Sequence, residues 1–356
     1  METAIDINPH LSICIPTYNR GRQLQDQIGS LVVRVYKHKI PLFISDNAST
    51  DCTGEVVRRW RDRYPHIYYA RNERNFGFDH NVRNVLKMST SRYAWLLSDD
   101  DRLEDGAVEQ VLAVAESGDF DMIVVNGGAL HDEDGNVVNG RVFHTGSAVF
   151  TDRNEVLGRI GWHMTWISSL IFGDGIRKKG NFDKFIGSQI IHFATVFDYL
   201  SSKDISVYWE SRCCVAGAQE GLPSWLGKTL EIWGKNWFDT IQALPRNYSE
   251  GAKRACMFTH GVKASLFDVY MLFLMRIHGF YDYSMLRKYR WYLPHVAKTS
   301  LLSFTMIAVL PRRLIKRKII RSLIKRLEWV VSFVKKYILR VTYPVYDGGS
   351  EVSPAA

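Results

Sequence analysis

The first hundred residues alternate short apolar runs with longer stretches in which polar and apolar residues mix. This alternation is typical of βαβ units, which build a mainly parallel sheet covered by helices. It therefore predicts an α/β fold for this part of the chain. The predicted strands are residues 13–15, 41–45, 66–71 and 93–98, and the predicted helices are residues 20–36, 51–63 and 78–88.

A cluster of polar residues follows each of the four predicted strands. In open α/β sheets, ligands bind outside the carboxyl ends of the strands. We therefore expect the clusters to line one cleft. They are residues 16–20, 46–51, 71–75 and 98–101.

Three consecutive aspartates, Asp99, Asp100 and Asp101, follow directly on the apolar run 93–97. Carboxylates this close repel one another and raise each other's pKa, unless a cation neutralises them. Mg²⁺ or Mn²⁺ suits oxygen ligands and commonly arrives with a substrate phosphate. The alternative is a polar turn, because Asp is a frequent turn residue. The other three polar clusters favour the metal site.

Beyond residue 103 the pattern becomes mixed. We expect a catalytic domain over residues 1–225 and a helical region, packed on it or extending it, over 226–295. Basic amphipathic helices over 296–345 and a disordered tail over 346–356 complete the predicted organisation. The further predicted elements are helices at 104–117 and 189–201, strands at 120–126, 165–172 and 205–210, a hairpin turn at 132–136 and a helical stretch at 226–290.

Composition narrows the class of protein. The 356 residues exceed the usual domain of about 100–200 residues, and 46% apolar with 23% charged residues argues against general disorder. The five cysteines form no CxxC pair, which suits a reducing compartment. The first residues lack the basic and apolar regions of a secretory signal. We therefore expect a cytoplasmic protein.

The net charge of +9 is concentrated near the C-terminus. Residues 296–345 hold twelve Lys or Arg against Glu328 alone, so a general nucleic-acid surface is not supported. On a helix, the apolar and basic residues of 315–341 fall on opposite sides, which predicts a peripheral anchor on an anionic membrane surface. The apolar run 301–310 is too short to span a bilayer. The alternative is a helix packed on the catalytic domain.

Four motifs, in this order, resemble those of the family 2 glycosyltransferases. A weaker similarity is to bacterial abequosyltransferase-type enzymes, which build O-antigen repeats on a lipid carrier. It runs through residues 168–170 (SSL), Phe182-Asp183, residues 186–188 (IGS) and His192. The resemblance implies a GT-A fold with a Rossmann-like, mainly parallel sheet, followed here by a C-terminal helical, basic amphipathic extension. The motifs are residues 13–20 (ICIPTYNR), 44–51 (ISDNASTD), 75–77 (NFG, with Asn81) and 95–101 (WLLSDDD).

The family's chemistry implies transfer of a sugar from a nucleotide-diphospho-sugar to a polyprenyl-linked saccharide at the inner face of the cytoplasmic membrane. By resemblance, Asp46 accepts a hydrogen bond from the nucleotide base. Asp51 is expected to cap the next helix instead. Arg71 is either a phosphate contact or a solvated side chain, and so is Arg74. The implied donor-binding residues are Pro16, Thr17, Tyr18, Arg20, Asp46, Asn47, Arg74, Asn75, Asp99 and Asp100.

The aspartates fit the family's Asp-x-Asp-Asp element in two registers. One places Ser98 at the first carboxylate and makes Asp100 the main metal ligand, with Asp99 and Asp101 on ribose, metal or donor sugar. The other makes Asp99 and Asp101 the pair. We expect the first register, with Asp99, Asp100 and Asp101 together forming the metal site.

Inverting members of the family use an acidic pair as the general base, and Ser188-Gln189 stands at the matching place here. Gln cannot accept a proton, so the base must come from elsewhere. The nearest candidates are His192, Asp183 and Asp174. A histidine suits the task near neutral pH, although a single histidine on a helix is often a packing residue. We expect His192 as base or metal ligand, with Asp183 as the second candidate.

Two rival functions remain open at this stage. The missing acidic pair is compatible with a membrane-associated nucleotide-sugar-binding protein without catalysis. A sugar nucleotidyltransferase would use a similar fold, but it should carry a Gly-rich, basic phosphate loop near the N-terminus. Residues 16–21 are no such loop.

Overall fold

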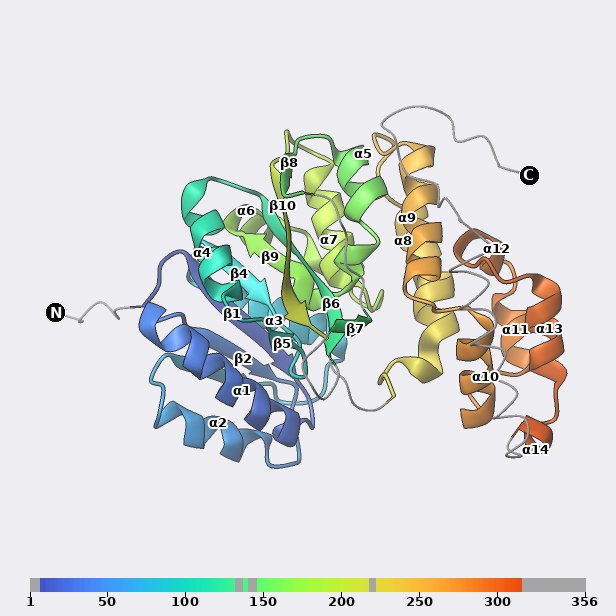
Figure 1. Cartoon of the computed structure of the whole chain (residues 1–356), viewed down its shortest axis with the longest axis horizontal. Coiled ribbons are helices and arrows are strands. Elements are labelled where there is room, and N and C mark those ends of the chain that lie inside the picture. Colours follow the sequence, from blue (N-terminus) through green and yellow to red (C-terminus); the bar gives the residue numbers. More distant parts are fainter. Residues whose placement is uncertain (1–6, 132–136, 140–145, 218–221, 316–356) are drawn as a thin grey trace. The chain divides into compact units, whose positions relative to one another are not determined.

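The computed structural model describes residues 7–131, 137–139, 146–217 and 222–315. The chain divides into two compact units (Figure 1). The unit that holds the β-sheet, here called the sheet unit, comprises residues 1–156 and 163–220. The other, called the helical unit, comprises residues 157–162 and 221–356.

Three predictions concern residues outside the described ranges. The hairpin turn at 132–136 and the tail at 346–356 are among them. The amphipathic segment 315–341 is described only at its first residue, Ile315.

Four strands of the sheet unit run parallel, in the order β3-β2-β1-β4. Their register places Thr17, Asp46 and Arg71 side by side at the carboxyl ends of β1, β2 and β3. The strands and helices expected in this part of the chain are confirmed. The strands are β1 (Leu11–Thr17), β2 (Leu42–Asp46), β3 (Ile67–Arg71) and β4 (Tyr93–Leu96).

The rest of the sheet is mixed, where the sequence predicted mainly parallel strands. β9 runs antiparallel to both β4 and β6, and β10 runs parallel to β6. The strand expected at 165–172 begins only at Leu170, because 3₁₀ turns occupy the preceding residues. The remaining strands are β5 (Arg102–Leu103), β6 (Met122–His131), β7 (Val137–Asn139), β8 (Ala148–Phe150), β9 (Leu170–Gly173) and β10 (Val207–Ala216).

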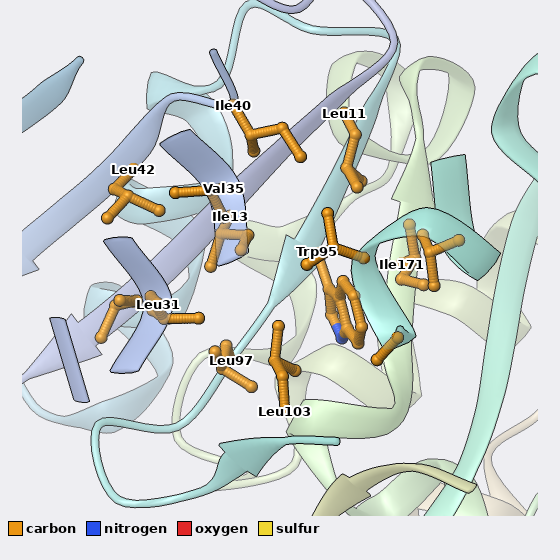
Figure 2. Packing of buried hydrophobic residues seen from close by; sticks show 14 of the residues in the cluster. Leu11, Ile13, Leu31, Val35, Ile40, Leu42, Trp95, Leu97, Leu103 and Ile171 are labelled. Atoms are coloured by element: carbon orange, nitrogen blue, oxygen red, sulfur yellow. The ribbon is translucent and has the colours of Figure 1, made fainter. Parts of the chain in front are cut away.

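Helices cover both faces of the sheet. On one face, α1, α2 and α4 pack against strand residues such as Ile13 and Leu42, and Leu31 and Val35 of α1 complete this core together with Trp95 (Figure 2). The opposite face carries α3, α6 and α7, which pack on one another. The helices are α1 (Gly21–Val35), α2 (Thr53–Arg61), α3 (Phe78–Met88), α4 (Ala107–Ser117), α6 (Asp174–Lys179) and α7 (Ile191–Leu200).

Short helical segments complete the sheet unit and lead to the helical unit. None of them was expected as a separate element, because runs of three to five residues leave no periodic pattern. They are η1 (Tyr36–His38), α5 (Arg153–Glu155), η2 (Val156–Ile160), η3 (His163–Thr165), η4 (Ile167–Ser169) and η5 (Phe182–Phe185).

The helical unit is built of short helices whose starts are encoded locally. Ser249, Asp268, Asp282 and Ser300 each precede a helix, and the side chain of each accepts a hydrogen bond from a first-turn N–H group. No described helix is both long and apolar enough to cross a membrane. The elements are η6 (Leu226–Lys228), η7 (Leu230–Asn236), α8 (Trp237–Gln242), α9 (Glu250–Lys263), α10 (Val269–His278), α11 (Tyr283–Tyr289), α12 (Leu293–Val296), α13 (Leu301–Val309) and α14 (Arg312–Ile315).

Candidate active site

Polar side chains from the ends of β1 and β4 meet at the carboxyl edge of the sheet. Thr17, the last residue of β1, donates its hydroxyl to Asp99 Oδ2 over 2.8 Å. Arg20, which precedes α1, donates from Nη1 to Asp100 Oδ2 over 2.7 Å, and its Nε lies 3.9 Å from Asp99 Oδ1. Two of the four predicted clusters therefore converge through direct hydrogen bonds.

The three aspartates occupy different environments. Asp99 is buried, whereas the Asp100 side chain is a quarter exposed and also accepts a hydrogen bond from Ser98. Asp101 is buried, and its Oδ2 accepts hydrogen bonds from Trp166 Nε1 over 2.7 Å and from the Ser168 hydroxyl. Asp101 is thus bound to the segment before β9, while Asp99 and Asp100 share Arg20.

Trp166 and Ser168 were not proposed as site residues on the basis of the sequence. Ser168 also accepts a hydrogen bond from the Ser98 N–H over 3.0 Å, and its carbonyl oxygen accepts one from Trp95 Nε1 over 2.9 Å. These bonds attach the aspartate loop to a segment seventy residues further along the chain. The weak similarity of residues 168–170 to known enzymes was the available signal, but it did not assign these residues a role in holding the aspartates.

Burial and the neighbouring carboxylates change the ionisation of Asp99. Burial raises the pKa of Asp99 to about 7. Asp100 adds to this rise, while Arg20 and the Thr17 hydroxyl oppose it. One guanidinium serves two carboxylates, so the group would gain from a further cation.

The chemistry of Asp99 and Asp100 fits a small, hard divalent ion. Among the described residues, no group of three His, Cys, Asp or Glu side chains is arranged to hold a metal by itself. An ion bound through one or two carboxylates would take its other ligands from water and from a substrate diphosphate, which is the usual mode of Mg²⁺ in nucleotide enzymes. Asp101 is less available, because Trp166 and Ser168 already bind one of its oxygens.

Asp46 lies at the end of β2 beside a cavity of ≈ 370 Å³. It is buried and accepts hydrogen bonds from the Ser49 N–H (2.8 Å) and the Tyr69 hydroxyl (2.6 Å). Arg71 Nε lies 3.7 Å from Asp46 Oδ2. A carboxylate offers about four lone-pair sites, so Asp46 retains capacity for one more donor. The cavity is also lined by Ser49, Asp51, Gly54, Glu55, Val57, Arg58, Arg61, Tyr69 and Arg71.

An amide network holds the loop between β3 and α3. Asn47 donates to Asn75 Oδ1 over 2.7 Å and accepts from the Phe76 N–H over 3.0 Å. Asn81 of α3 donates to the Thr17 carbonyl oxygen over 3.1 Å. Asn47 and Asn75 thus hold the loop in place by binding each other.

The remaining predicted donor contacts lie at the surface. Tyr18 is 42% exposed and Pro16 is half-buried at the end of β1. The exposed Arg74 guanidinium lies 4.9 Å from the centre of the Phe76 ring. These side chains are accessible to a ligand, and their predicted roles stay predictions.

Asp51 acts as a helix cap, as expected. Its carboxylate accepts hydrogen bonds from the Thr53 N–H (3.0 Å), at the start of α2, and from the Gly21 N–H (2.9 Å), at the start of α1. Negative charge at a helix N-terminus is favourable, because the first N–H groups have no partner within the helix. One side chain therefore orients both helices that flank the candidate site.

His192 lies on α7, where its environment suits packing better than proton transfer. It is buried, and its Nε2 is 3.0 Å from the Thr165 carbonyl oxygen, which makes Nε2 the donor. Its ring meets Phe78 edge to face at 6.0 Å. Burial lowers the pKa of His192 to about 4, and the bond to Thr165 only partly opposes this. Thr165, which binds Nε2, immediately precedes Trp166, the residue that binds Asp101.

Each of the two carboxylate candidates for the base has a cationic partner of its own. Asp183, in η5, is largely exposed and pairs with Arg83 of α3. Asp174 follows β9, and β9 runs antiparallel to β4, so Asp174 lies beside Tyr93 at the opposite edge of the sheet. It lines a cavity of ≈ 580 Å³ there, in which Lys203 pairs with Asp121.

A buried carboxylate that sequence reasoning missed holds the segment containing Ser188-Gln189. Asp79, in the first turn of α3, accepts hydrogen bonds from the N–H groups of Gly187 (2.8 Å), Gln189 (2.9 Å) and Ile191 (3.4 Å). The signal available was an acidic residue in the first turn of a helix, but that feature is common. Asp79 thereby attaches the start of α7 to α3.

Comparisons with known proteins agree with this geometry. The family model described as Glycosyl transferase family 2 matches residues 12–172. Abequosyltransferase RfbV of Salmonella typhimurium is 39% identical over 95 residues, which are 26% of this chain and 28% of the relative. GalNAc(5)-diNAcBac-PP-undecaprenol beta-1,3-glucosyltransferase of Campylobacter jejuni is 30% identical over 131 residues, 36% of this chain and 41% of the relative. Both alignments cover less than half of the relative.

Solved structures resemble the chain in fold. The crystal structure of S. aureus TarS 1-349 in complex with UDP-GlcNAc has a TM-score of 0.53 and 16% sequence identity, over 73% of this chain and 74% of that one. The match to the family model includes all four polar strand ends. Residues 12–172 therefore match glycosyltransferase family 2, and the α/β fold of the chain is of the GT-A type.

Proposed function

We propose that this chain transfers a sugar from a nucleotide-diphospho-sugar to a polyprenyl-linked saccharide during synthesis of a bacterial surface polysaccharide of O-antigen type. The observation that carries the proposal is the pairing of Asp99 and Asp100 with Arg20 at the carboxyl edge of the sheet. Two relatives support the substrate class, since one is named as an abequosyltransferase and the other as acting on an undecaprenol-diphosphate saccharide.

The donor nucleotide would occupy the edge formed by β1, β2 and β3. Asp46 would accept a hydrogen bond from the base, because Ser49 and Tyr69 hold the carboxylate in place and leave it acceptor capacity. Pro16, Thr17 and Tyr18 would line the nucleoside. Asn47, Asn75 and Arg74 would form the opposite wall, with the Arg74 guanidinium free to turn toward phosphate.

Asp99 and Asp100 would hold Mg²⁺ or Mn²⁺ together with the donor diphosphate, and Asp101 would keep the loop in position through Trp166 and Ser168. A bound divalent cation neutralises the charge that develops on the leaving diphosphate. Arg20 now occupies the same oxygens, so it would release Asp100 when the donor binds and turn its guanidinium to the phosphates. Its charge would then stabilise the leaving diphosphate.

An acceptor hydroxyl would attack the anomeric carbon on the face opposite the diphosphate, with inversion. The segment held by Asp79 would border this acceptor side, since it carries the position of the family's acidic pair. His192 and Asp183 remain the predicted bases. Either one would have to gain access to the hydroxyl proton through movement of the segment 182–192.

The place of reaction would be the inner face of the cytoplasmic membrane, with the protein bound peripherally. The basic segment 296–345 supports this location, because its cations suit anionic headgroups and its apolar residues recur on one side of a predicted helix.

A donor-hydrolysis screen tests the proposal. The full chain is incubated with a panel of nucleotide-diphospho-sugars, with and without Mg²⁺ or Mn²⁺, and release of the nucleoside diphosphate is measured. We expect release with one donor and only with a divalent ion. Product NMR with an accepted saccharide would then report inversion at the anomeric carbon.

The same screen separates the rival functions. Saturable donor binding without turnover, even with acceptor present, would favour a nucleotide-sugar-binding protein without catalysis. Formation of a nucleotide-sugar from a sugar phosphate and a nucleoside triphosphate would favour the nucleotidyltransferase. Either result contradicts the proposed transfer.

A further inference from the structure

Helix α13 leaves an apolar face exposed on the helical unit. Its sequence, LLSFTMIAV, is apolar almost all round, a composition normally found in helices that are buried on every side. Here one side alone is buried, through Phe304, Ile307 and Ala308, where α13 packs on α10 and α11. Leu302 is 70% exposed, and Met306 is 57% exposed.

The exposed side chains form one continuous stripe. At 3.6 residues per turn, the exposed Leu301, Leu302, Met306 and Val309 and the half-buried Thr305 fall within an arc of about 140°. Thr305, the polar member, donates its hydroxyl to the Leu301 carbonyl oxygen over 2.8 Å, so its one donor is used within the helix. The stripe therefore offers a surface of methyl, methylene and thioether groups to whatever covers it.

The stretch of sequence that contains α13 carries charge of one sign. Between Tyr283 and Ile315 the sequence contains no Asp or Glu. Six exposed cations lie in the same interval, and two of them follow α13 directly. They are Arg287, Lys288, Arg290, Lys298, Arg312 and Arg313.

We propose that the exposed face of α13 inserts into the headgroup region of an anionic lipid bilayer, with the neighbouring Lys and Arg side chains on the lipid phosphates. Apolar side chains beside exposed cations match both layers of such an interface. A second copy of this chain would bring the same cations together, which is unfavourable. The inference rests on the proposed membrane location and assigns it a surface within the described residues.

The test is sedimentation of the full chain with vesicles. Vesicles of phosphatidylcholine alone are compared with vesicles that also contain phosphatidylglycerol. The variant carries Leu302→Glu and Met306→Glu. The matched control carries Val33→Glu and Val149→Glu, two exposed apolar positions of the sheet unit that are 81% and 50% exposed. Circular dichroism melting checks that each variant is folded.

We expect the wild type and the control to bind the anionic vesicles and not the neutral ones. Binding of the α13 variant should fall at least about tenfold, because two apolar side chains lose their lipid contact and two negative charges are added. Unchanged binding of this variant would overturn the inference. So would a wild type that fails to bind vesicles, whether it dimerises through α13, as sedimentation velocity would show, or stays monomeric.

Donor hydrolysis by the α13 variant in solution keeps the two proposals apart. Normal hydrolysis with lost vesicle binding supports both. Lost vesicle binding in a chain that hydrolyses no donor at all leaves the membrane surface supported and contradicts the proposed transferase. Normal hydrolysis with unchanged vesicle binding supports the proposed transferase and contradicts the membrane surface on α13.

Discussion

The sheet unit and the helical unit depart from the usual distribution of polar and apolar groups in opposite ways. The sheet unit buries Thr17, Asp46, Asp99 and Asp101 at one edge, and hydrogen bonds satisfy each of them. The helical unit instead exposes several apolar side chains along one helix, α13, among them Leu302. Buried carboxylates and exposed apolar surface are both unfavourable in an isolated chain. The contrast is consistent with the two proposals, a divalent cation with a donor diphosphate at the sheet unit and an anionic lipid surface at α13.

Removing Asp100 should have the largest effect on the function assigned to the sheet unit. We expect Asp100→Ala to lower donor turnover about a thousandfold, because the leaving diphosphate loses its charge compensation. The melting temperature should stay near that of the wild type, since Asp100 is partly exposed. Asp105→Ala, at a surface carboxylate paired only with Arg34, serves as the control. Retained turnover in Asp100→Ala would contradict the assigned role.

The two faces of α13 offer the sharpest stability contrast within the helical unit. Phe304→Ala should lower the free energy of unfolding by about 4 kcal/mol, because a fully buried ring leaves a cavity. Leu302→Ala should change it by less than about 0.5 kcal/mol, because that side chain is already exposed. Urea unfolding measures both values. Equal losses would mean that the exposed face is covered within the protein.

His192 predicts how the stability of the sheet unit depends on pH. Its pKa in the folded chain is about 4, against an ordinary value near 6.5, so the unfolded chain binds more protons between these values. The free energy of unfolding should therefore have its full value above pH 6.5 and fall by about 3 kcal/mol as the pH drops toward 4. Unfolding of the wild type and of His192→Gln across this range measures the effect.

A folded His192→Gln variant should lose most of this pH dependence. If it keeps donor turnover and loses transfer to the acceptor alone, His192 is the base after all. Loss of stability with both activities intact would identify it as a packing residue.

Tyr69→Phe should have the smallest effect. It removes the hydroxyl that binds Asp46, leaving the carboxylate free to turn. We expect the KM for the donor to rise about tenfold with kcat little changed, because one hydrogen bond to a charged group is lost. Steady-state kinetics on the preferred donor separates the two constants. A fall in kcat alone would place Tyr69 outside donor binding.

Local sequence predicted the parallel half of the sheet well, and the comparison of β4 with β9 shows why it did less well further on. Short apolar strands and amphipathic helices between residues 11 and 96 carry their own periodicity, which depends on near neighbours. The direction of β9 depends on where the chain re-enters the sheet, about seventy residues after β4. No periodic pattern encodes the direction of β9, whose antiparallel pairing makes the expected mainly parallel sheet mixed.

In the candidate site, too, the features that depend on near neighbours in sequence were predicted, and those that depend on distant segments were not. The positions of the polar clusters that contain the aspartates, Asp46 and Asp51 were predicted from the strand pattern, and the role of Asp46 came from the family resemblance. The partners Trp166, Ser168 and Tyr69 act on them through contacts that cross the sheet, and sequence spacing cannot reveal such contacts. Sequence spacing could not reveal the burial of His192 either, because that burial depends on Phe78 and Thr165 of other elements.

The sequence by itself determined which edge of the sheet carries the carboxylates, because strand ends and helix caps are local features. It also determined the charge and apolar character of the C-terminal helices. Only the tertiary structure decided which aspartate is held by Trp166 and Ser168, which ones share Arg20, and which side of α13 remains exposed. The physical reason is that burial and hydrogen-bond partners depend on packing between distant segments, whereas periodicity and capping depend on residues a few positions apart.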